Sequence, residues 1–369
     1  MKTIWIDIYH IPQFNYYLPL IRRLVKLGHV VLLTALNRGR LVTICKNDLT
    51  KFNLMGDENS MFPHVELYSI GKHRMKKWSV ILEANMLRII RLFFWRFKHH
   101  VDICFTNGFH AAMLSRLFGN LCYTFGDDPD TFDLKPKLCF ATKVHFCLYD
   151  RPYNLDYRAK VLKCLKEWSS LSINTFEPNI CVLGKYGVQP KQYIFLREVS
   201  VGTVNYAGQA AGAIRDVASM IANAQCTMHN GEKMKVLFSL EEKNRRSEYP
   251  ADWILLQEPI EDIHSLIYYS AGLVSSGDSM AREAALLGVP AYYLGIRHSM
   301  PANLAASKVA NLQNTVTMPF EQWITNVCDG AKSVEERIND QNILRDKIDH
   351  EFIDINAYML SLVEKEREK

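Results

Sequence analysis

The chain has 369 residues, of which 48% are hydrophobic, 22% charged and 11% aromatic. This length corresponds to about two domains, and the composition excludes disordered, collagen-like and low-complexity chains. The net charge of +5 is too small to indicate a nucleic-acid partner. No run of about 18 uncharged apolar residues occurs, and Asp7 interrupts the first apolar stretch, so we expect neither a membrane-spanning helix nor a secretion signal.

The nine cysteines form no C-x-x-C pair and lie mostly in apolar stretches. We therefore expect reduced, mostly buried thiols, no metal site and a cytoplasmic protein.

The first half of the chain alternates short apolar runs with helical patterns. The pattern predicts strands at 2–8, 29–35, 64–70, 102–106 and 121–125, and helices at 16–27, 37–53, 78–98 and 109–118. Strands separated by helices of this length indicate βαβ units and a parallel sheet. Residues 127–175 are less regular.

The predicted helix at 78–98 lies in the most basic part of the chain. Residues 71–100 hold eight Lys and Arg residues against Glu83 alone, interleaved with aromatic residues. On a helix the basic and apolar residues fall on different sides, as in helices that lie on an anionic membrane surface. The alternative is a helix packed on a sheet with a solvated basic edge. The predicted membrane or acceptor patch consists of Arg88, Arg91, Trp95, Arg96 and Lys98.

A second alternating series begins near Gln192. It predicts strands at 193–197, 235–240, 253–256, 272–275 and 291–294, and helices at 213–223, 262–270 and 279–287. From about residue 319 the chain becomes helical and charged. We therefore expect a first domain over 1–175, a second over 176–335 and a charged C-terminal helix over 336–369.

The segment from Gly272 to Tyr293 carries the clearest chemical signal. An apolar strand ends in Ser275-Ser276-Gly277-Asp278-Ser279, and a helix begins at once with Glu283 one turn in. Free N–H groups and the helix dipole favour a phosphate at such a helix start. Gly277 lets the backbone come close, and Glu283 can accept hydrogen bonds from a ribose diol. The alternative is an ordinary βαβ turn in which Asp278 or Ser279 is the N-cap.

This segment resembles the second-domain signature of the GT-B superfamily, which includes the MurG-type glycosyltransferases and the UDP-N-acetylglucosamine 2-epimerases. The resemblance is strongest to an archaeal and bacterial family within it. It rests on Trp5-Ile6-Asp7, Tyr193–Ser200, Glu258-Pro259-Ile260 and the block Met280-Ala-Arg-Glu-Ala-Ala-Leu-Leu-Gly-Val-Pro290. It covers roughly residues 1–330 and implies an α/β fold of two Rossmann-like parallel-sheet domains facing across a cleft.

The resemblance also implies a set of donor-binding residues in the second domain. Ser276, Gly277, Asp278 and Ser279 would hold the donor diphosphate, and Glu283 the ribose. Glu258 and Ile260 would lie along the nucleobase, and Arg197 would reach the phosphates or the sugar. For Arg197 the alternative is an ion pair with a neighbour such as Glu198 or Asp278.

The first domain is expected to supply the acceptor side and a catalytic base. His10 follows the first strand, and Asp127 and Asp128 follow the strand at 121–125, all at the edge that would face the cleft. The alternatives are a capping or packing role for His10 and an Asx-type turn before Pro129.

Two departures from the resemblance bear on function. The 2-epimerases carry a His-Arg-Arg-Glu-Asn segment where this chain reads Leu196-Arg197-Glu198-Val199-Ser200, and the MurG type carries a glycine-rich turn where residues 8–13 have no glycine. Neither subgroup's mechanism therefore transfers whole.

The resemblance implies a metal-independent glycosyltransferase whose co-substrate is a nucleotide sugar, UDP-linked, with no other cofactor. The charged patch favours a sugar or lipid-linked acceptor at the inner face of a membrane, in the biosynthesis of a cell-surface polysaccharide or glycoconjugate. The alternatives are a nucleotide-sugar 2-epimerase or hydrolase, and a non-catalytic GT-B-like binding protein.

Overall fold

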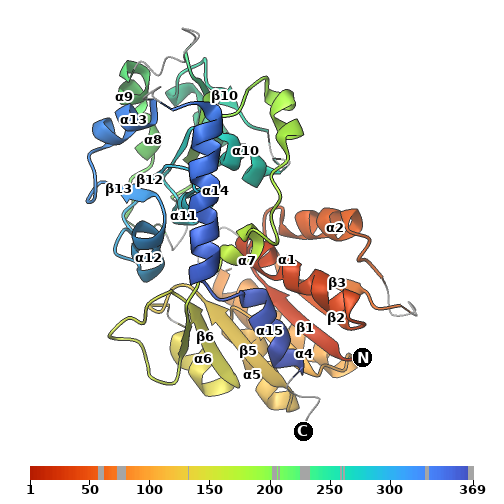
Figure 1. Cartoon of the computed structure of the whole chain (residues 1–369). Coiled ribbons are helices and arrows are strands. Elements are labelled where there is room, and N and C mark those ends of the chain that lie inside the picture. Colours follow the sequence, from red (N-terminus) through yellow and green to blue (C-terminus); the bar gives the residue numbers. More distant parts are fainter. Residues whose placement is uncertain are drawn as a thin grey trace. The chain divides into compact units, whose positions relative to one another are not determined.

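The chain forms two compact units. The computed structural model describes residues 1–56, 62–72, 80–131, 133–201, 206, 208–224, 233–257, 260, 262–328 and 332–364. Unit 1 comprises Met1–Ser170 and Phe352–Lys369, and unit 2 comprises Leu171–Glu351. In place of the single C-terminal helix expected over 336–369, α14 (Val334–Glu351) belongs to unit 2 and α15 (Ile355–Glu364) to unit 1 (Figure 1).

Unit 1 contains a seven-stranded parallel sheet in the order β3-β2-β1-β4-β5-β6-β7. The strands are β1 (Thr3–Ile8), β2 (Val30–Asn37), β3 (Val65–Lys72), β4 (Ile103–Thr106), β5 (Leu121–Gly126), β6 (Lys143–Cys147) and β7 (Lys160–Leu162). The strand order reverses between β1 and β4, so the carboxyl ends of these two strands form the position where open α/β sheets bind ligands.

Helices cover both faces of this sheet. They are α1 (Ile11–Lys26), α2 (Leu41–Lys51), the π-helix η1 (Val80–Leu87), α4 (Arg88–Lys98), α5 (Phe109–Phe118), α6 (Leu134–Phe140) and α7 (Trp168–Leu171). α15 lies against α1, and α4 lies against α5 and β3 (Figure 1). Pro12 in the first turn starts α1 before its predicted beginning at Tyr16, because proline fits a position whose N–H has no helical partner. On the α4 face, the Trp5 ring packs 5.3 Å from that of Trp95.

Unit 2 contains a six-stranded parallel sheet in the order β10-β9-β8-β11-β12-β13. The strands are β8 (Tyr193–Glu198), β9 (Lys235–Leu240), β10 (Ile254–Leu255), β11 (Gly272–Ser275), β12 (Ala291–Tyr293) and β13 (Leu312–Asn314). The remaining elements are the 3-10 helices η2 (Ile180–Tyr186) and η4 (Lys243–Glu248), and helices α8 (Ala213–Asp216), α9 (Ala218–Asn223), α10 (Ile263–Tyr269), α11 (Asp278–Leu286), α12 (Pro301–Val309) and α13 (Phe320–Cys328). Here the strand order reverses between β8 and β11.

Gly288 explains why α11 ends where it does. It follows α11 with φ +76°, a left-handed conformation that glycine adopts without strain. A Cβ at this position would lie 2.6 Å from Cγ of Gln341 in α14. The Leu-Gly-Val-Pro sequence therefore ends the helix and lets α14 cross it at close range.

The cysteines differ in part from the expectation of reduced thiols throughout. Within the described ranges seven cysteines are free, five of them buried, but Cys328 is disulfide-bonded. Across those ranges we find no helix with the length and apolar character needed to cross a membrane.

Candidate functional site

The predicted donor residues of unit 2 gather where β8 and β11 end side by side. Gly272–Ser275 pairs in register with Ile194–Arg197, so the turn after β11 begins beside the loop after β8. Two hydrogen bonds join them: Val199 N–H donates to Ser276 Oγ over 2.9 Å, and Gln209 Nε2 donates to the Ser276 carbonyl over 2.9 Å. The residues brought to this sheet edge are Arg197, Ser276, Gly277, Asp278 and Ser279.

Gly277 is required for a reason that the sequence did not reveal. Its φ is −106°, which any residue can adopt. A Cβ here, however, would lie 2.6 Å from Cγ1 of Val199 and 3.2 Å from the Tyr206 hydroxyl. The glycine makes room for the loop after β8, so its presence alone is no evidence of a bound phosphate.

Asp278 is the first residue of α11, and its side chain is buried. Its carboxylate accepts hydrogen bonds from Nη1 of Arg282 and Nη1 of Arg297, both over 3.3 Å, and from the Ser279 N–H over 3.0 Å. The Tyr206 hydroxyl donates to it over 3.4 Å. A carboxylate that already faces the helix start and two guanidiniums holds these donors in fixed positions.

Arg197 is ion-paired, but not with either partner expected from the sequence. Its Nη1 donates to Ser239 Oγ over 2.6 Å and its Nη2 donates to the Glu241 carboxylate. Both partners lie at the end of β9, which pairs with β8 and places Ser239 opposite Arg197. The guanidinium is therefore held at the carboxyl end of the sheet, 15% exposed.

Glu283 contacts a histidine that the sequence did not single out. Oε2 of Glu283 lies 3.4 Å from Nε2 of His264, in the first turn of α10. Burial opposes the charged imidazole, but the hydrogen bond and the charge of Glu283 outweigh it and raise the pKa of His264. The predicted ribose ligand is thus already paired. Of the predicted nucleobase residues, Ile260 is half-buried just before α10, and Glu258 lies outside the described residues.

The carboxyl edge of the unit 2 sheet, where β8 and β11 end, is suited to binding an anion. The side chain of Arg297 is 22% exposed, so two guanidiniums of this edge, those of Arg197 and Arg297, are partly accessible. Both lie near the start of α11, whose dipole and N–H groups also favour negative charge. Within the described residues no three His, Cys, Asp or Glu side chains are grouped as a metal site would need. Arg297 was missed because it follows β12, in a loop without a recognisable motif.

In unit 1 the three predicted catalytic residues have different surroundings. His10 precedes α1 at the end of β1, and Nη1 of Arg38 lies 2.9 Å from its Nδ1. Nζ of Lys166 lies 2.5 Å from the Asp127 carboxylate. Asp128 Oδ1 accepts the Asp130 N–H over 3.0 Å, which is the Asx-type turn given as its alternative. No hydrogen bond or ion pair between these three is seen in the described part of the chain.

The end of β1 instead holds a buried ion pair. Arg88 Nη2 donates to Asp7 Oδ1 over 2.6 Å, and both side chains are fully buried. Thr34 Oγ1 donates to the same carboxylate over 2.6 Å. Burial disfavours the Arg88 cation, but the charge of Asp7 more than compensates and raises its pKa. The signal for this pair was Asp7 itself, a carboxylate inside an apolar strand.

Tyr9 and His110 extend this cluster. The Tyr9 hydroxyl lies 2.9 Å from Nδ1 of His110, and the Arg88 guanidinium lies 4.3 Å from the centre of the Tyr9 ring. Burial and then the charge of Arg88 lower the pKa of His110 to about 4. The imidazole is therefore neutral near pH 7.

The predicted patch on α4 needs correction. Arg88 is buried on Asp7, Trp95 packs on Trp5, and Arg96 is buried with its guanidinium on the carbonyl of His99 at 2.6 Å. Arg91 and Lys98 remain exposed. The exposed face of η1 and α4 carries apolar side chains that are 50–75% accessible, namely Met86, Ile90, Phe94 and Phe97.

No protein-family model matches the sequence, and a search of curated proteins finds no similar sequence. The structure is similar to solved structures over its full length. It matches spinosyn forosaminyltransferase with 12% identity and a TM-score of 0.61, covering 100% of both chains. It matches a protein from Listeria monocytogenes described as a UDP-N-acetylglucosamine 2-epimerase with 12% identity and a TM-score of 0.65, covering 100% of this chain and 96% of the other. It matches MurG from Acinetobacter baumannii with 13% identity and a TM-score of 0.53, covering 99% and 100%. The predicted pair of parallel-sheet domains is confirmed, and the chain has the GT-B fold.

Proposed function

We propose that the protein is a glycosyltransferase that moves a sugar from a nucleotide diphosphate sugar to an acceptor. The observation that supports this most is the similarity of the whole chain, both units included, to solved glycosyltransferases. The proposal places the donor on unit 2 and the acceptor on unit 1.

On unit 2, the donor diphosphate would lie at the start of α11, within reach of Arg197 and Arg297. A phosphate gains most from guanidiniums that are already fixed, because little reorganisation is then needed as negative charge develops on the leaving group. Glu241 and Asp278 fix these two guanidiniums. The N–H groups of Ser276 and Ser279 already donate to the Arg197 carbonyl and the Asp278 carboxylate, each over 3.0 Å, so the two guanidiniums would make the main contacts with the diphosphate. Ile260 would lie along the base. This arrangement supports a nucleoside diphosphate leaving group that is stabilised without a metal ion; the proposal that the donor is UDP-linked rests on the sequence resemblance.

On unit 1, His10 is the base best supported by the structure. It is half-buried at the end of β1, where the strand order reverses. Nη1 of Arg38 lies 2.9 Å from Nδ1 of His10 and 3.1 Å from its Nε2, so a fixed cation lies beside the imidazole, whose neutral form can accept a proton. The Asp128 carboxylate is committed to a turn, and Asp127 is paired with Lys166, which leaves Asp127 as the second candidate.

The exposed face of α4 supports an acceptor at a membrane. Phe94 and Phe97 are 62% and 75% exposed, and Arg91 and Lys98 flank them. An amphipathic helix of this kind inserts apolar side chains at the interface while its cations meet anionic headgroups. We therefore propose a lipid-linked or membrane-proximal acceptor at the inner leaflet, as in the assembly of surface polysaccharides.

Phe94→Ser with Phe97→Ser is expected to abolish cosedimentation with anionic liposomes, whereas Phe62→Ser, an exposed phenylalanine elsewhere in unit 1, is expected to leave it unchanged. Equal binding by all three proteins would contradict the membrane proposal.

The test of the main proposal is a panel of nucleotide sugars incubated with the pure protein without an acceptor. We expect one donor to bind saturably and to stay intact, read by proton NMR and mass spectrometry. Arg197→Gln is expected to weaken that binding by about 1–3 kcal/mol, the usual loss for a charged hydrogen bond. No binding of any nucleotide sugar would contradict the proposal.

The same panel tests a second function, nucleotide-sugar 2-epimerisation or hydrolysis. It is favoured by the TM-score of 0.65 with the protein described as a 2-epimerase. Against it, Leu196–Ser200 lacks the His and Asn of the epimerase segment. An epimer, a free sugar or a free nucleotide formed without an acceptor would replace the transferase proposal with this one.

A further inference from the structure

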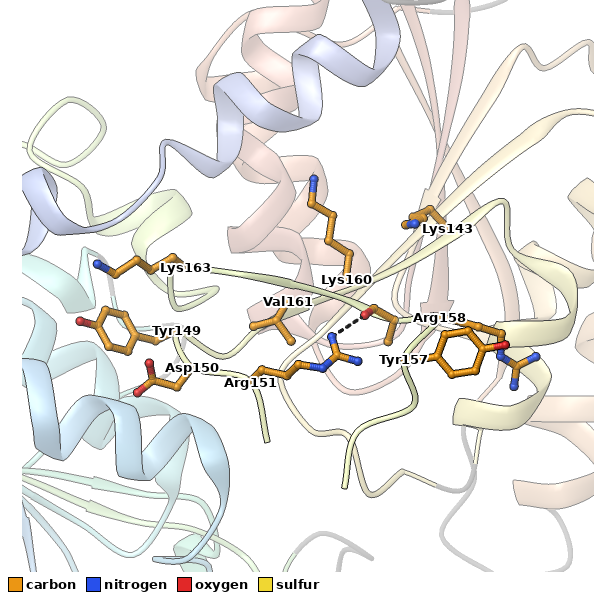
Figure 2. Close-up of a pocket in the computed structure, with 10 residues that line it drawn as sticks. Lys143, Tyr149, Asp150, Arg151, Tyr157, Arg158, Lys160, Val161 and Lys163 are labelled. Atoms are coloured by element: carbon orange, nitrogen blue, oxygen red, sulfur yellow. Dashed lines mark hydrogen bonds between the residues drawn. The ribbon is translucent and has the colours of Figure 1, made fainter. Parts of the chain in front are cut away.

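An open pocket lies at the β7 edge of the sheet of unit 1, and none of the predicted catalytic residues is among the residues that line it. Its volume is about 540 Å³, within the range of sites for small molecules. It is lined by the ends of β6 and β7 and by the loop that joins them, and Figure 2 shows basic side chains projecting from these segments around it. Nothing in the proposed transfer reaction uses it.

The pocket is strongly cationic. Its lining holds five basic side chains against one carboxylate, that of Asp150, and all five are exposed: Lys143, Arg151, Arg158, Lys160 and Lys163. Arg158 makes a two-pronged pair with the nearby Asp156, at 3.0 and 2.8 Å. Lys160 Nζ instead donates to the Tyr358 hydroxyl over 3.0 Å, so its hydrogen bond holds it in place without cancelling its charge. The pocket therefore favours an anion.

The loop that forms the pocket is held in shape by its own hydrogen bonds. The Arg151 guanidinium donates to the carbonyls of Ala159 over 2.9 Å, Leu155 over 3.3 Å and Asp156 over 2.8 Å. Figure 2 shows the first of these bonds closing the loop onto the start of β7. Because the loop is ordered before any ligand arrives, binding loses less conformational entropy.

The loop also presents aromatic rings to solvent. Tyr153 and Tyr157 are 102% and 87% exposed, which is unusual for large partly apolar side chains. A tyrosine ring is a flat surface on which the apolar face of a sugar ring can pack, while its hydroxyl remains in water. Cations beside exposed tyrosines suit a ligand that has both sugar rings and acidic groups.

We propose that this edge pocket binds an acidic sugar chain, one whose rings carry carboxylate, phosphate or sulfate groups. The cations would meet the acidic groups, and Tyr157 would pack on a ring. The choice of a sugar chain rests on the proposed function, because unit 1 is assigned to the acceptor; the choice of an anion rests on the pocket alone. The pocket would then hold part of the acceptor remote from the reacting hydroxyl.

The experiment measures binding of fluorescent oligosaccharides to the full chain by anisotropy, without a nucleotide sugar. The probes are oligogalacturonate and a heparin fragment, each of about eight sugars, with a neutral maltodextrin of equal length and a thymidine oligonucleotide as comparisons. We expect one or both acidic probes to bind, more weakly as NaCl rises from about 50 to 200 mM, and the neutral probe not to bind. Preference for the carboxylated or the sulfated probe identifies the acidic group.

Two variants with the same loss of charge locate the site. Lys143→Gln, Lys160→Gln and Lys163→Gln together are expected to weaken binding by at least about tenfold, since three ionic contacts are lost. The matched control replaces Lys26, Lys46 and Lys51, exposed lysines of α1 and α2, with Gln, and is expected to bind like the wild type. Circular dichroism confirms that both variants are folded.

Three outcomes overturn the pocket proposal: neither acidic probe binds, both triple variants bind them equally, or the oligonucleotide binds as tightly as the acidic sugars. The last outcome would indicate general attraction of polyanions or a nucleic-acid partner. Donor binding in the nucleotide-sugar panel does not depend on these lysines. A normal donor response with failed oligosaccharide binding therefore overturns this inference alone, and the reverse result overturns only the transferase proposal.

Discussion

The two sheets share a topology but differ in how accessible some of their charged side chains are at the point where the strand order reverses. In unit 1, the Asp7–Arg88 pair at the end of β1 is fully buried. In unit 2, the Arg197 and Arg297 side chains are 15% and 22% exposed, each held by a carboxylate. A buried pair cannot meet a ligand without unfolding, whereas a partly exposed guanidinium can. The comparison indicates that, where the strand order reverses, the Asp7–Arg88 pair of unit 1 fixes the fold, whereas Arg197 and Arg297 of unit 2 are accessible to a ligand.

The largest effect of a single substitution is expected from breaking the buried pair. Arg88→Met leaves the Asp7 carboxylate without its cation in the interior, which is expected to destabilise unit 1 by about 3–5 kcal/mol. The free energy of unfolding in urea measures this. Asp7→Asn combined with Arg88→Met is expected to recover part of the loss, because no charge then stays buried.

Arg91→Gln is the matched control for that experiment. Its side chain is 48% exposed and pairs with Glu83 at 3.5 Å, so its loss is expected to change stability by less than about 1 kcal/mol. Equal losses for Arg88 and Arg91 variants would contradict the assigned difference between buried and exposed charge.

The next effect is expected from mild acid, which lowers the free energy of unfolding of unit 1. Burial lowers the pKa values of His110 and His145 to about 4, so the unfolded chain takes up these protons near pH 6.5 while the folded unit resists them. Stability is therefore present above pH 6.5 and is lost as the pH falls toward 4, by up to roughly 3 kcal/mol for each imidazole. Urea unfolding at several pH values measures the slope, which His110→Gln with His145→Gln is expected to flatten; an unchanged slope would refute the assignment.

In unit 2, Gly277→Ala tests whether loop packing or a ligand requires the glycine. The added Cβ would press on Val199, whose branched side chain has few alternative rotamers, and is expected to cost about 1–3 kcal/mol of stability. Val199→Ala in the same chain is expected to restore thermal stability. A Gly277→Ala protein of normal stability that no longer binds a nucleotide sugar would instead show that the glycine is needed for the ligand.

The smallest effect is expected at the His264–Glu283 pair. Its contribution to stability depends on pH with the opposite sign to that of the two histidines in unit 1. Since Glu283 raises the pKa of His264 against the effect of burial, the pair stabilises unit 2 below pH 6.5 and is lost as the pH rises through the raised pKa. The contribution is expected to be roughly 1 kcal/mol. Unfolding measured from pH 6 to 8 should show it in the wild type and not in Glu283→Gln; a pH trend that persists in the variant would rule it out.

The strands that the sequence predicted well are those with continuous apolar runs. β9 and β11 have the predicted bounds, because both are buried on two faces, each begins with a polar or glycine residue, and each is followed by a polar residue. β6 and β7 were missed: Lys143 and His145 interrupt one, and the other has three residues at the sheet edge. β13 was missed for the same reason of shortness.

The sequence predicted where the candidate site lies, but not which side chains contact one another there. Strand order along a chain does not reveal that β9 lies beside β8, so the Arg197–Glu241 pair was missed. Arg88 and Asp7 are 81 residues apart, and no local pattern joins them. The same pair explains the error at α4. Helical periodicity separates a basic face from an apolar face but does not show which one is buried. Here Arg88 is buried on Asp7, and Phe94 and Phe97 are exposed.

The arrangement of α14 and α15 determines the order in which the two units can be completed during synthesis. Unit 1 begins at Met1 but includes α15, which lies against α1 and whose Tyr358 hydroxyl is 3.0 Å from Nε2 of His145. Unit 2 is contained wholly between these two parts. On the ribosome, the unit that is started first is therefore the one that is completed last, and until its final helix emerges the nascent first unit exposes the apolar surface that α15 will cover.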